Sequence, residues 1–126
     1  MSAFILTKPR ASSGGVLGVI TEGVAIPKVE TSPTNVVVVD AAPNANAMVK
    51  WVYSIIDDIN EKVLSAEVNV TNSFNNTLKF SRHSITGDIL SHTIDVKYQG
   101  SSVVLEITNL TSFDFRVNIL RIDLPF

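Results

Sequence analysis

The sequence contains no cysteine, one tryptophan and two histidines, and charged residues make up only 17% of its 126 positions. Without cysteine, neither a disulfide framework nor a thiolate metal site can form. The net charge is −2 with acidic and basic residues interspersed, so the clustered lysines and arginines typical of nucleic-acid binding are missing. No apolar run approaches the length that spans a membrane. A hydrophobic content of 45% is enough for one domain with its own core.

Sequence motifs for catalysis are missing as well. The chain has no nucleophile elbow, no phosphate-binding loop and no clustered set of metal ligands. Serine and threonine are abundant, but no local signature supplies a base or an oxyanion hole. We therefore expect a non-enzymatic protein without a metal or a cofactor.

From residue 35 onward, apolar and polar residues alternate with a period of two, which is typical of half-buried antiparallel strands. The alternation is clearest over residues 94–98, 103–107 and 113–119, and the sequence Gln99-Gly100-Ser101 between the first two predicts a hairpin. We predict an all-β fold, an antiparallel and jelly-roll-like β-sandwich, formed by residues 35–126.

Residues 48–64 allow a second interpretation. Their apolar side chains also match the stripe of an amphipathic helix, which would make the fold α+β. The density of β-branched and aromatic residues and a turn at residues 57–60 favour strand–turn–strand instead. The stripe consists of Met48, Trp51, Val52, Ile55, Ile56, Ile59 and Val63.

The last strand changes its pattern part-way. Its apolar residues occupy odd positions through Ile119 and even positions at Leu120, Ile122 and Leu124. A β-bulge near Ile119 and Leu120 would turn both halves toward the core. A strand buried on both faces explains the same pattern equally well.

Residues 1–34 differ from the rest and predict an extended N-terminal arm. Prolines and glycines interrupt this segment, yet its apolar content is too high for a solvated linker. The apolar side chains must be buried against their own domain, a neighbouring copy or a larger assembly. We predict that six of them bind a partner: Val16, Leu17, Val19, Ile20, Val24 and Ile26.

The acidic residues near position 57 and the two histidines are the polar groups that could form a metal or catalytic site. A structural role explains each of them as well. The acidic residues at 57, 58 and 61 could hold calcium, but the glycine and the distant glutamate of an EF-hand are missing, so a solvated turn is expected. His83 shares the polar side of its strand, and His92 shares the apolar side of the next. Neither histidine has a sequence neighbour that establishes a catalytic pair.

Several motifs resemble small structural domains in the virions of tailed bacteriophages. The resemblance covers about residues 49–124 and lies in these segments: 50–55 (KWVYSI), 62–68 (KVLSAEV), 86–88 (TGD), 96–100 (VKYQG), 104–109 (VLEITN) and 117–122 (VNILRI). It implies a β-sandwich located in the virion, as a capsid decoration or cement protein or as a tail-associated protein. It also implies a homo-oligomer, such as a trimer, that contacts other virion proteins through its arm and sandwich edges. It implies no catalytic residues.

A carbohydrate- or receptor-binding module of a phage fibre is the alternative function. Trp51, Tyr53 and Tyr98 could form an aromatic platform for such a ligand. All three lie on the apolar side of their strands, however, which favours packing in the core with the polar tip reaching outward.

Overall fold

The computed structural model describes residues 18–28, 36–74 and 77–126, and these residues form strands, turns and loops without a helix. The strands are β1 (Gly18–Ile26), β2 (Val36–Pro43), β3 (Asn46–Asp57), β4 (Lys62–Asn72), β5 (Leu78–Gly87), β6 (His92–Gln99), β7 (Ser102–Asn109) and β8 (Phe115–Pro125). Residues 48–64 therefore fold as strand–turn–strand, and the helical alternative is wrong. In the same described residues, no helix is long and apolar enough to cross a membrane.

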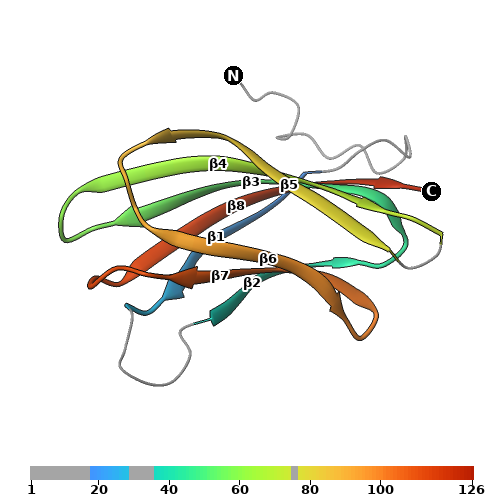
Figure 1. Ribbon diagram of the computed structural model, residues 1–126, viewed down its shortest axis with the longest axis horizontal. Helices are drawn as coiled ribbons and strands as arrows, with labels where there is room; N and C mark the ends of the chain where they lie inside the picture. Colours follow the sequence, from blue (N-terminus) through green and yellow to red (C-terminus); the bar gives the residue numbers. More distant parts are fainter. Residues whose placement is uncertain (1–17, 29–35, 75–76) are drawn as a thin grey trace.

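Two antiparallel sheets pack against each other, which confirms the predicted β-sandwich (Figure 1). One sheet has the order β1-β8-β3-β4-β5 and the other has the order β2-β7-β6. β3, β4 and β5 follow one another as hairpins, and β8 returns to lie beside β3, which is a Greek-key arrangement. The chain changes sheets four times, between β1 and β2, β2 and β3, β5 and β6, and β7 and β8.

The core lies between the sheets and follows the alternation of the sequence. On β3, every second residue points inward, and Trp51, Tyr53 and Ile55 have no exposed surface. Leu105 and Ile107 on β7 are equally buried from the opposite sheet. Because the period of a strand is two, each of these strands supplies a complete apolar face to the core.

β8 has no extra residue near Ile119 and Leu120, so the bulge predicted there is wrong. Its pairing with β3 runs without a shift from Leu124 to Arg116. The odd positions of β8 face the core as far as Arg121, and the even positions face outward. The apolar residues Leu120, Ile122 and Leu124 therefore lie on the outer side of the sheet, where they are partly exposed or exposed.

The irregularity lies instead on β1, which has an extra residue between Thr21 and Val24. Gly23 adopts a φ of +69° there, and its N–H donates a hydrogen bond of 2.8 Å to Oδ1 of Asn118 on β8. A left-handed conformation of this kind is accessible to glycine at little steric cost.

The predicted arm is part of the sandwich wherever the structure describes it. β1 completes the five-stranded sheet beside β8, so the sheet includes residues 18–26 in addition to strands from residues 36–126. Ile26 is fully buried and Val24 packs against the core, whereas Val19 and Ile20 are exposed. For this part of the arm, the receiving surface is its own domain. Val16 and Leu17 lie outside the described residues, and the division of the chain at residue 34 stays a prediction.

Candidate functional site

The outer side of the five-stranded sheet carries a continuous group of apolar side chains, which we call the outer patch. Strand pairing places Ile20 of β1, Leu120 of β8 and Val52 of β3 side by side in one row. Met48 and Leu124 form a second pair. The outer patch consists of Ile20, Met48, Val52, Leu120, Ile122 and Leu124. Ile20 is 62% exposed and Leu124 is 44% exposed.

Apart from the exposed Glu22, which shares a hollow with Ile20, Val52 and Leu120, the surroundings of the outer patch are neutral or internally paired. Lys50 lies beside Ile122 and forms an ion pair of 2.9 Å with Glu67 on β4. The hydrogen bond from Lys50 lowers the pKa of Glu67, so this carboxylate is ionised near neutral pH. Ser54 and Asn118 pair across β3 and β8 at the other end of the outer patch. A partner of the outer patch would therefore meet a mainly apolar surface with few uncompensated charges.

Both edges of the five-stranded sheet are interrupted by bulges. β1 has its extra residue near Gly23. β5 has an extra residue opposite Ala66, where Ser84 has a φ of +57°. Bulges twist an edge strand out of the regular geometry that another strand would need for pairing. The outer patch, rather than either edge, is the better-formed contact surface of this sheet.

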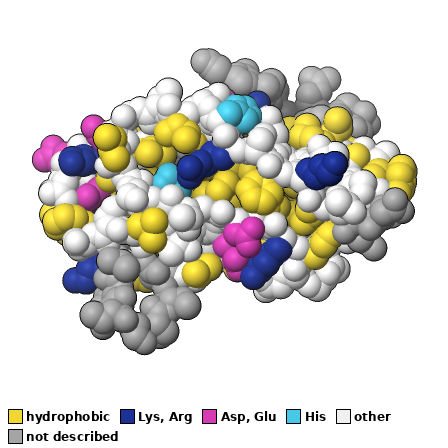
Figure 2. All heavy atoms as spheres, in the orientation of Figure 1, with side chains coloured by type: hydrophobic (Ala, Val, Ile, Leu, Met, Phe, Trp, Pro, Cys, Tyr) yellow, Lys and Arg dark blue, Asp and Glu magenta, His cyan; other side chains and the backbone are white. Residues whose placement is uncertain are grey.

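A second feature is a pocket of about 280 Å³ where the chain passes from β5 to β6, which we call the flank pocket. Figure 2 shows that hydrophobic side chains are exposed beside basic ones near the middle of the face it draws. The lining of the flank pocket consists of Leu64, Arg82, Ile85, Thr86, Gly87, Asp88, Ile89, Leu90, Ser91 and His92.

The polar wall of the flank pocket is a chain of hydrogen bonds from the core to the surface. Nδ1 of His92 donates to the carbonyl of Leu90 at 2.7 Å, so the neutral ring presents Nε2 as an acceptor. The Tyr53 hydroxyl donates to this Nε2 at 2.8 Å, and Nη1 of Arg82 lies 3.3 Å from it. The rings of Tyr53 and His92 also meet edge to face. His92 is thus a structural acceptor that holds Arg82 at the pocket.

Burial determines the protonation states of Tyr53 and His92 in this hydrogen-bonded wall. Desolvation raises the pKa of Tyr53, so its hydroxyl keeps the proton that it donates. Desolvation also lowers the pKa of His92, and the nearby Arg82 lowers it further against the opposing effect of the Leu90 carbonyl. Among the described residues, no carboxylate forms an ion pair with His92 or His83. His83 lies opposite Glu67 across β4 and β5 and helps to lower the pKa of that carboxylate.

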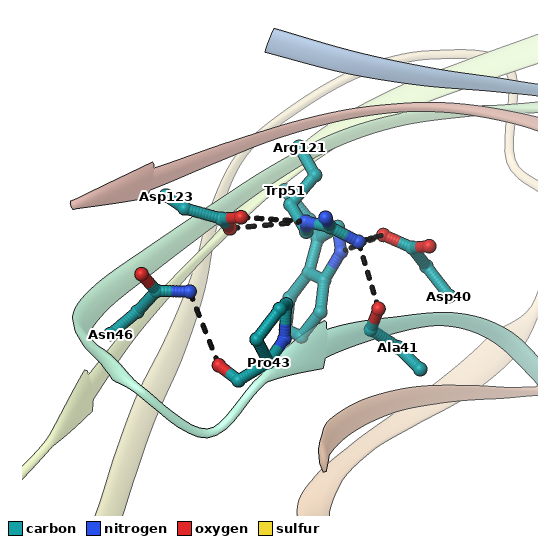
Figure 3. Close-up of polar contacts among 7 residues, drawn as sticks. All are labelled: Asp40, Ala41, Pro43, Asn46, Trp51, Arg121 and Asp123. Carbon is teal, nitrogen blue, oxygen red and sulfur yellow. Dashed lines mark hydrogen bonds and ion pairs between the residues drawn. The ribbon is translucent and has the colours of Figure 1, made fainter. Parts of the chain in front are cut away.

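A mostly buried polar cluster joins the two sheets (Figure 3). Asp40 of β2 accepts hydrogen bonds from Nε1 of Trp51 at 2.8 Å and from Nη1 of Arg121 at 3.0 Å. Arg121 also donates to the carbonyl of Ala41 at 2.8 Å and pairs with Asp123 at 3.0 Å. Every strong donor in the cluster has an acceptor, which indicates a structural tie rather than a reactive site.

Sequence reasoning missed this tie, although one signal was present. Arg121 occupies an odd position of β8, which is the side that Val117 and Ile119 direct to the core. A charged residue at an inward position requires a buried partner. The identity of that partner, Asp40, depends on contacts 81 residues apart.

The aromatic platform predicted for the alternative function is not formed. Trp51 and Tyr53 are completely buried and their polar atoms are used within the protein. Tyr98 is half-buried, and its hydroxyl donates to Oδ1 of Asn72 on the other sheet. Because a sugar must stack on an open ring face, Trp51 and Tyr53 cannot serve as ligand-binding residues.

The acidic turn after β3 is satisfied by its own backbone. Oδ1 of Asp57 accepts hydrogen bonds from the N–H groups of Ile59 and Asn60, and Oδ2 accepts one from the Asn60 side chain. These bonds lower the pKa of Asp57, with the side chain of Asn60 contributing most. Asp58 pairs instead with Arg116 at 2.8 Å. The described residues contain no group of three or more potential metal ligands.

Comparisons with known proteins find a weak structural similarity and no match in sequence. No family model matches the chain, and no curated protein matches it. Among solved structures, the chain is similar to the tailspike protein of the Acinetobacter phage vB_ApiP_P1, with a TM-score of 0.46 and 16% identity. The match covers 99% of this chain and 24% of the tailspike, so the chain spans about a quarter of that protein's length. A likeness of this size assigns neither a family nor a function.

Proposed function

We propose that this chain is a non-enzymatic structural domain of a tailed-phage virion, associated with the tail or the capsid, that assembles with further copies of itself. The observation that carries the proposal is the outer patch, where Leu120, Ile122 and Leu124 of β8 face solvent together with apolar neighbours on β1 and β3. Contiguous apolar surface of this kind marks sites of protein association. The phage setting rests on the sequence motifs between residues 49 and 124.

A second copy is the partner that best fits the outer patch. Lys50 lies within the patch, between Met48 and Val52 on β3, and its charge is compensated by Glu67. A partner therefore needs an apolar, uncharged surface, and the same patch on another copy meets that need in an isologous contact. The bulges near Gly23 and Ser84 disfavour the competing route, which is strand pairing along an edge.

Substitutions at the most exposed positions of the outer patch test self-association. In sedimentation velocity over a range of concentrations, the full chain is expected to associate, and Ile20→Glu combined with Leu124→Glu is expected to be monomeric. Ile59→Glu is the matched control, because Ile59 is 71% exposed in the turn after β3 and lies outside the outer patch. A full chain that stays monomeric, or a double variant that associates as the wild type does, contradicts the proposal.

The phage setting has its own test. Purified particles from a phage that encodes the chain are expected to contain it in many copies by quantitative mass spectrometry. Electron microscopy of those particles is expected to place it in the tail or on the capsid. Absence of the chain from intact particles would overturn the virion assignment and leave the self-association test unaffected.

A further inference from the structure

We propose that the flank pocket is a binding site for a small carboxylate with a short, branched aliphatic body. This site is separate from the outer patch, because it lies between β5 and β6 rather than on the outer side of β1, β8 and β3. The proposal therefore does not depend on self-association.

The cation of the site is Arg82. Its guanidinium is hydrogen-bonded to Tyr53 and its Nη1 lies 3.3 Å from Nε2 of His92, and among the described residues it forms no ion pair with a carboxylate. By contrast, Arg116 and Arg121 each pair with an aspartate. A guanidinium offers five N–H donors in a planar fork that matches a carboxylate. Arg82 thus retains donors for an anion that enters the pocket.

The acid in the lining is already engaged. Oδ2 of Asp88 accepts a hydrogen bond of 2.9 Å from the N–H of Val63, and the N–H of Asp88 donates one of 2.8 Å to the Val63 carbonyl. This reciprocal pair fixes residue 88 to the start of β4. The neighbouring Gly87 has a φ of +98°, and a Cβ there would lie 2.4 Å from the Val63 oxygen. The wall formed by residues 87 and 88 is therefore built by close backbone contact and is present before a ligand arrives.

His92 does not compete for the role of anion-binding cation. Its Nδ1–H is donated to Leu90, and its Nε2 accepts from the Tyr53 hydroxyl, while Nη1 of Arg82 lies 3.3 Å from the same nitrogen. The positive charge that faces the flank pocket is then that of Arg82. The hydroxyls of Thr86 and Ser91 add neutral hydrogen-bonding groups to the same lining.

The remaining lining is aliphatic and selects the body of the ligand. Leu64 and Leu90 are buried, whereas Ile85 and Ile89 are exposed, Ile89 by 91%. Small-molecule sites combine such apolar walls with few polar groups that orient the ligand, and the volume of about 280 Å³ lies at the small end of their range. One guanidinium in a largely apolar pocket suits a singly charged carboxylate better than a doubly charged phosphate. A compact acid such as 3-methylbutanoate satisfies each of these conditions.

The test is an amide-resolved NMR titration of the full chain with three probes: 3-methylbutanoate, the uncharged 3-methylbutanamide, and inorganic phosphate. The carboxylate is expected to cause saturable shifts at Thr86, Gly87, Ser91 and His92, with a Kd of about 1 mM, as befits a ligand of so few atoms. The amide and phosphate are expected to bind at least about tenfold more weakly, because each lacks either the charge or the fit to a single fork.

Variants on β5 locate the interaction. Arg82→Met is expected to weaken 3-methylbutanoate binding about tenfold or more, and Arg82→Lys is expected to fall between it and the wild type. Lys79→Met is the matched control, since Lys79 is an exposed cation on the same strand but outside the pocket lining. The amide spectra of all variants report whether the sandwich is intact.

Three outcomes overturn the proposal. The first is an absence of saturable shifts in the flank pocket at about ten times the expected Kd. The second is equal binding of 3-methylbutanoate and its amide, which would show an apolar cavity without a preference for anions. The third is a folded Arg82→Met variant that binds the carboxylate as tightly as Lys79→Met does.

Discussion

β6 and β8 obey the same alternation but use their outward residues differently. β6 turns Thr93, Asp95 and Lys97 to solvent, and the half-exposed Lys97 forms an ion pair with Glu106. β8 instead turns Leu120 and Ile122 outward and places the charged Arg121 inward between them. The first arrangement suits a sheet face that stays in water. The arrangement on β8 places the charge of Arg121 inside, where Asp40 compensates it. The outer face of β8 is then apolar at Leu120 and Ile122 and available for a partner.

The largest expected effect comes from breaking the inward charge of β8. Arg121→Ala would leave Asp40 buried without its ion-pair partner, and loss of one partner of a buried pair costs about 3–5 kcal/mol. Arg116→Ala on the same strand should cost at most about 1 kcal/mol, because its pair with Asp58 is exposed. Urea unfolding monitored by tryptophan fluorescence measures both. Equal losses would show that Arg121 is not the structural tie.

Core truncations on β7 come next. Leu105→Ala and Ile107→Ala each remove a fully buried side chain and should lower the free energy of unfolding by about 2–5 kcal/mol. Urea unfolding monitored by tryptophan fluorescence measures the free energy of unfolding of both variants. If either variant is as stable as the wild type, the inward face of β7 is assigned incorrectly.

The free energy of unfolding measured over a range of pH tests the role of His92, which lies on the inward side of β6. Burial holds the pKa of His92 below its ordinary value in the folded protein, so the unfolded state binds more protons as the pH falls. The contribution of His92 to stability is therefore present above about pH 6.5, the unfolded value, and is lost as the pH falls toward the folded pKa. His92→Gln should have a shallower decline of stability between neutral and mildly acidic pH than the wild type.

The control for this series is His83→Gln, since His83 lies on the outward side of β5 near Asn69 and Ser84. Of the two variants, His92→Gln should have the shallower decline. A decline of equal steepness in His92→Gln would mean that other groups cause it.

The smallest expected effects lie on the outward side of β6 and β7. Lys97→Ala and Glu106→Ala disrupt an ion pair in which Lys97 is half exposed, and each should change the free energy of unfolding by about 0.5 kcal/mol or less. Thermal unfolding at low and moderate salt checks both. Losses that approach those of Leu105→Ala would contradict the assignment of this side to solvent.

The sandwich could be predicted because its evidence is local. Alternation in the segments around residues 94–98 and 103–107 defines both strand type and inward face, and the structure places Leu105 and Ile107 in the core as expected. The turn after β3 was also predictable, since aspartate and asparagine bond their own backbone there. Such features need only a few neighbouring residues.

The candidate sites depend on pairing between distant segments and could be predicted only in part. The change of pattern at Leu120 was visible, but only the register of β8 with β1 and β3 shows that it creates an outer patch. Arg82 follows Leu78 and Phe80 on the inward side of β5, a signal that the sequence analysis did not use. Its position beside His92 requires the passage from one sheet to the other. The glycines of residues 18–26 argued against a regular strand in the sequence. β1 forms nevertheless, because the left-handed residue Gly23 is accommodated in a bulge.

Solvent access to individual methyl groups tests the central claim most directly. In a methyl NMR experiment with a soluble paramagnetic probe, Ile20, Leu120, Ile122 and Leu124 are compared with Ile59 at low and high protein concentration. The account predicts that the outer-patch methyls lose access to the probe as concentration rises, while Ile59 in the turn stays equally accessible. If the methyls of the outer patch remain as accessible at high concentration as at low concentration, this face does not mediate association between copies.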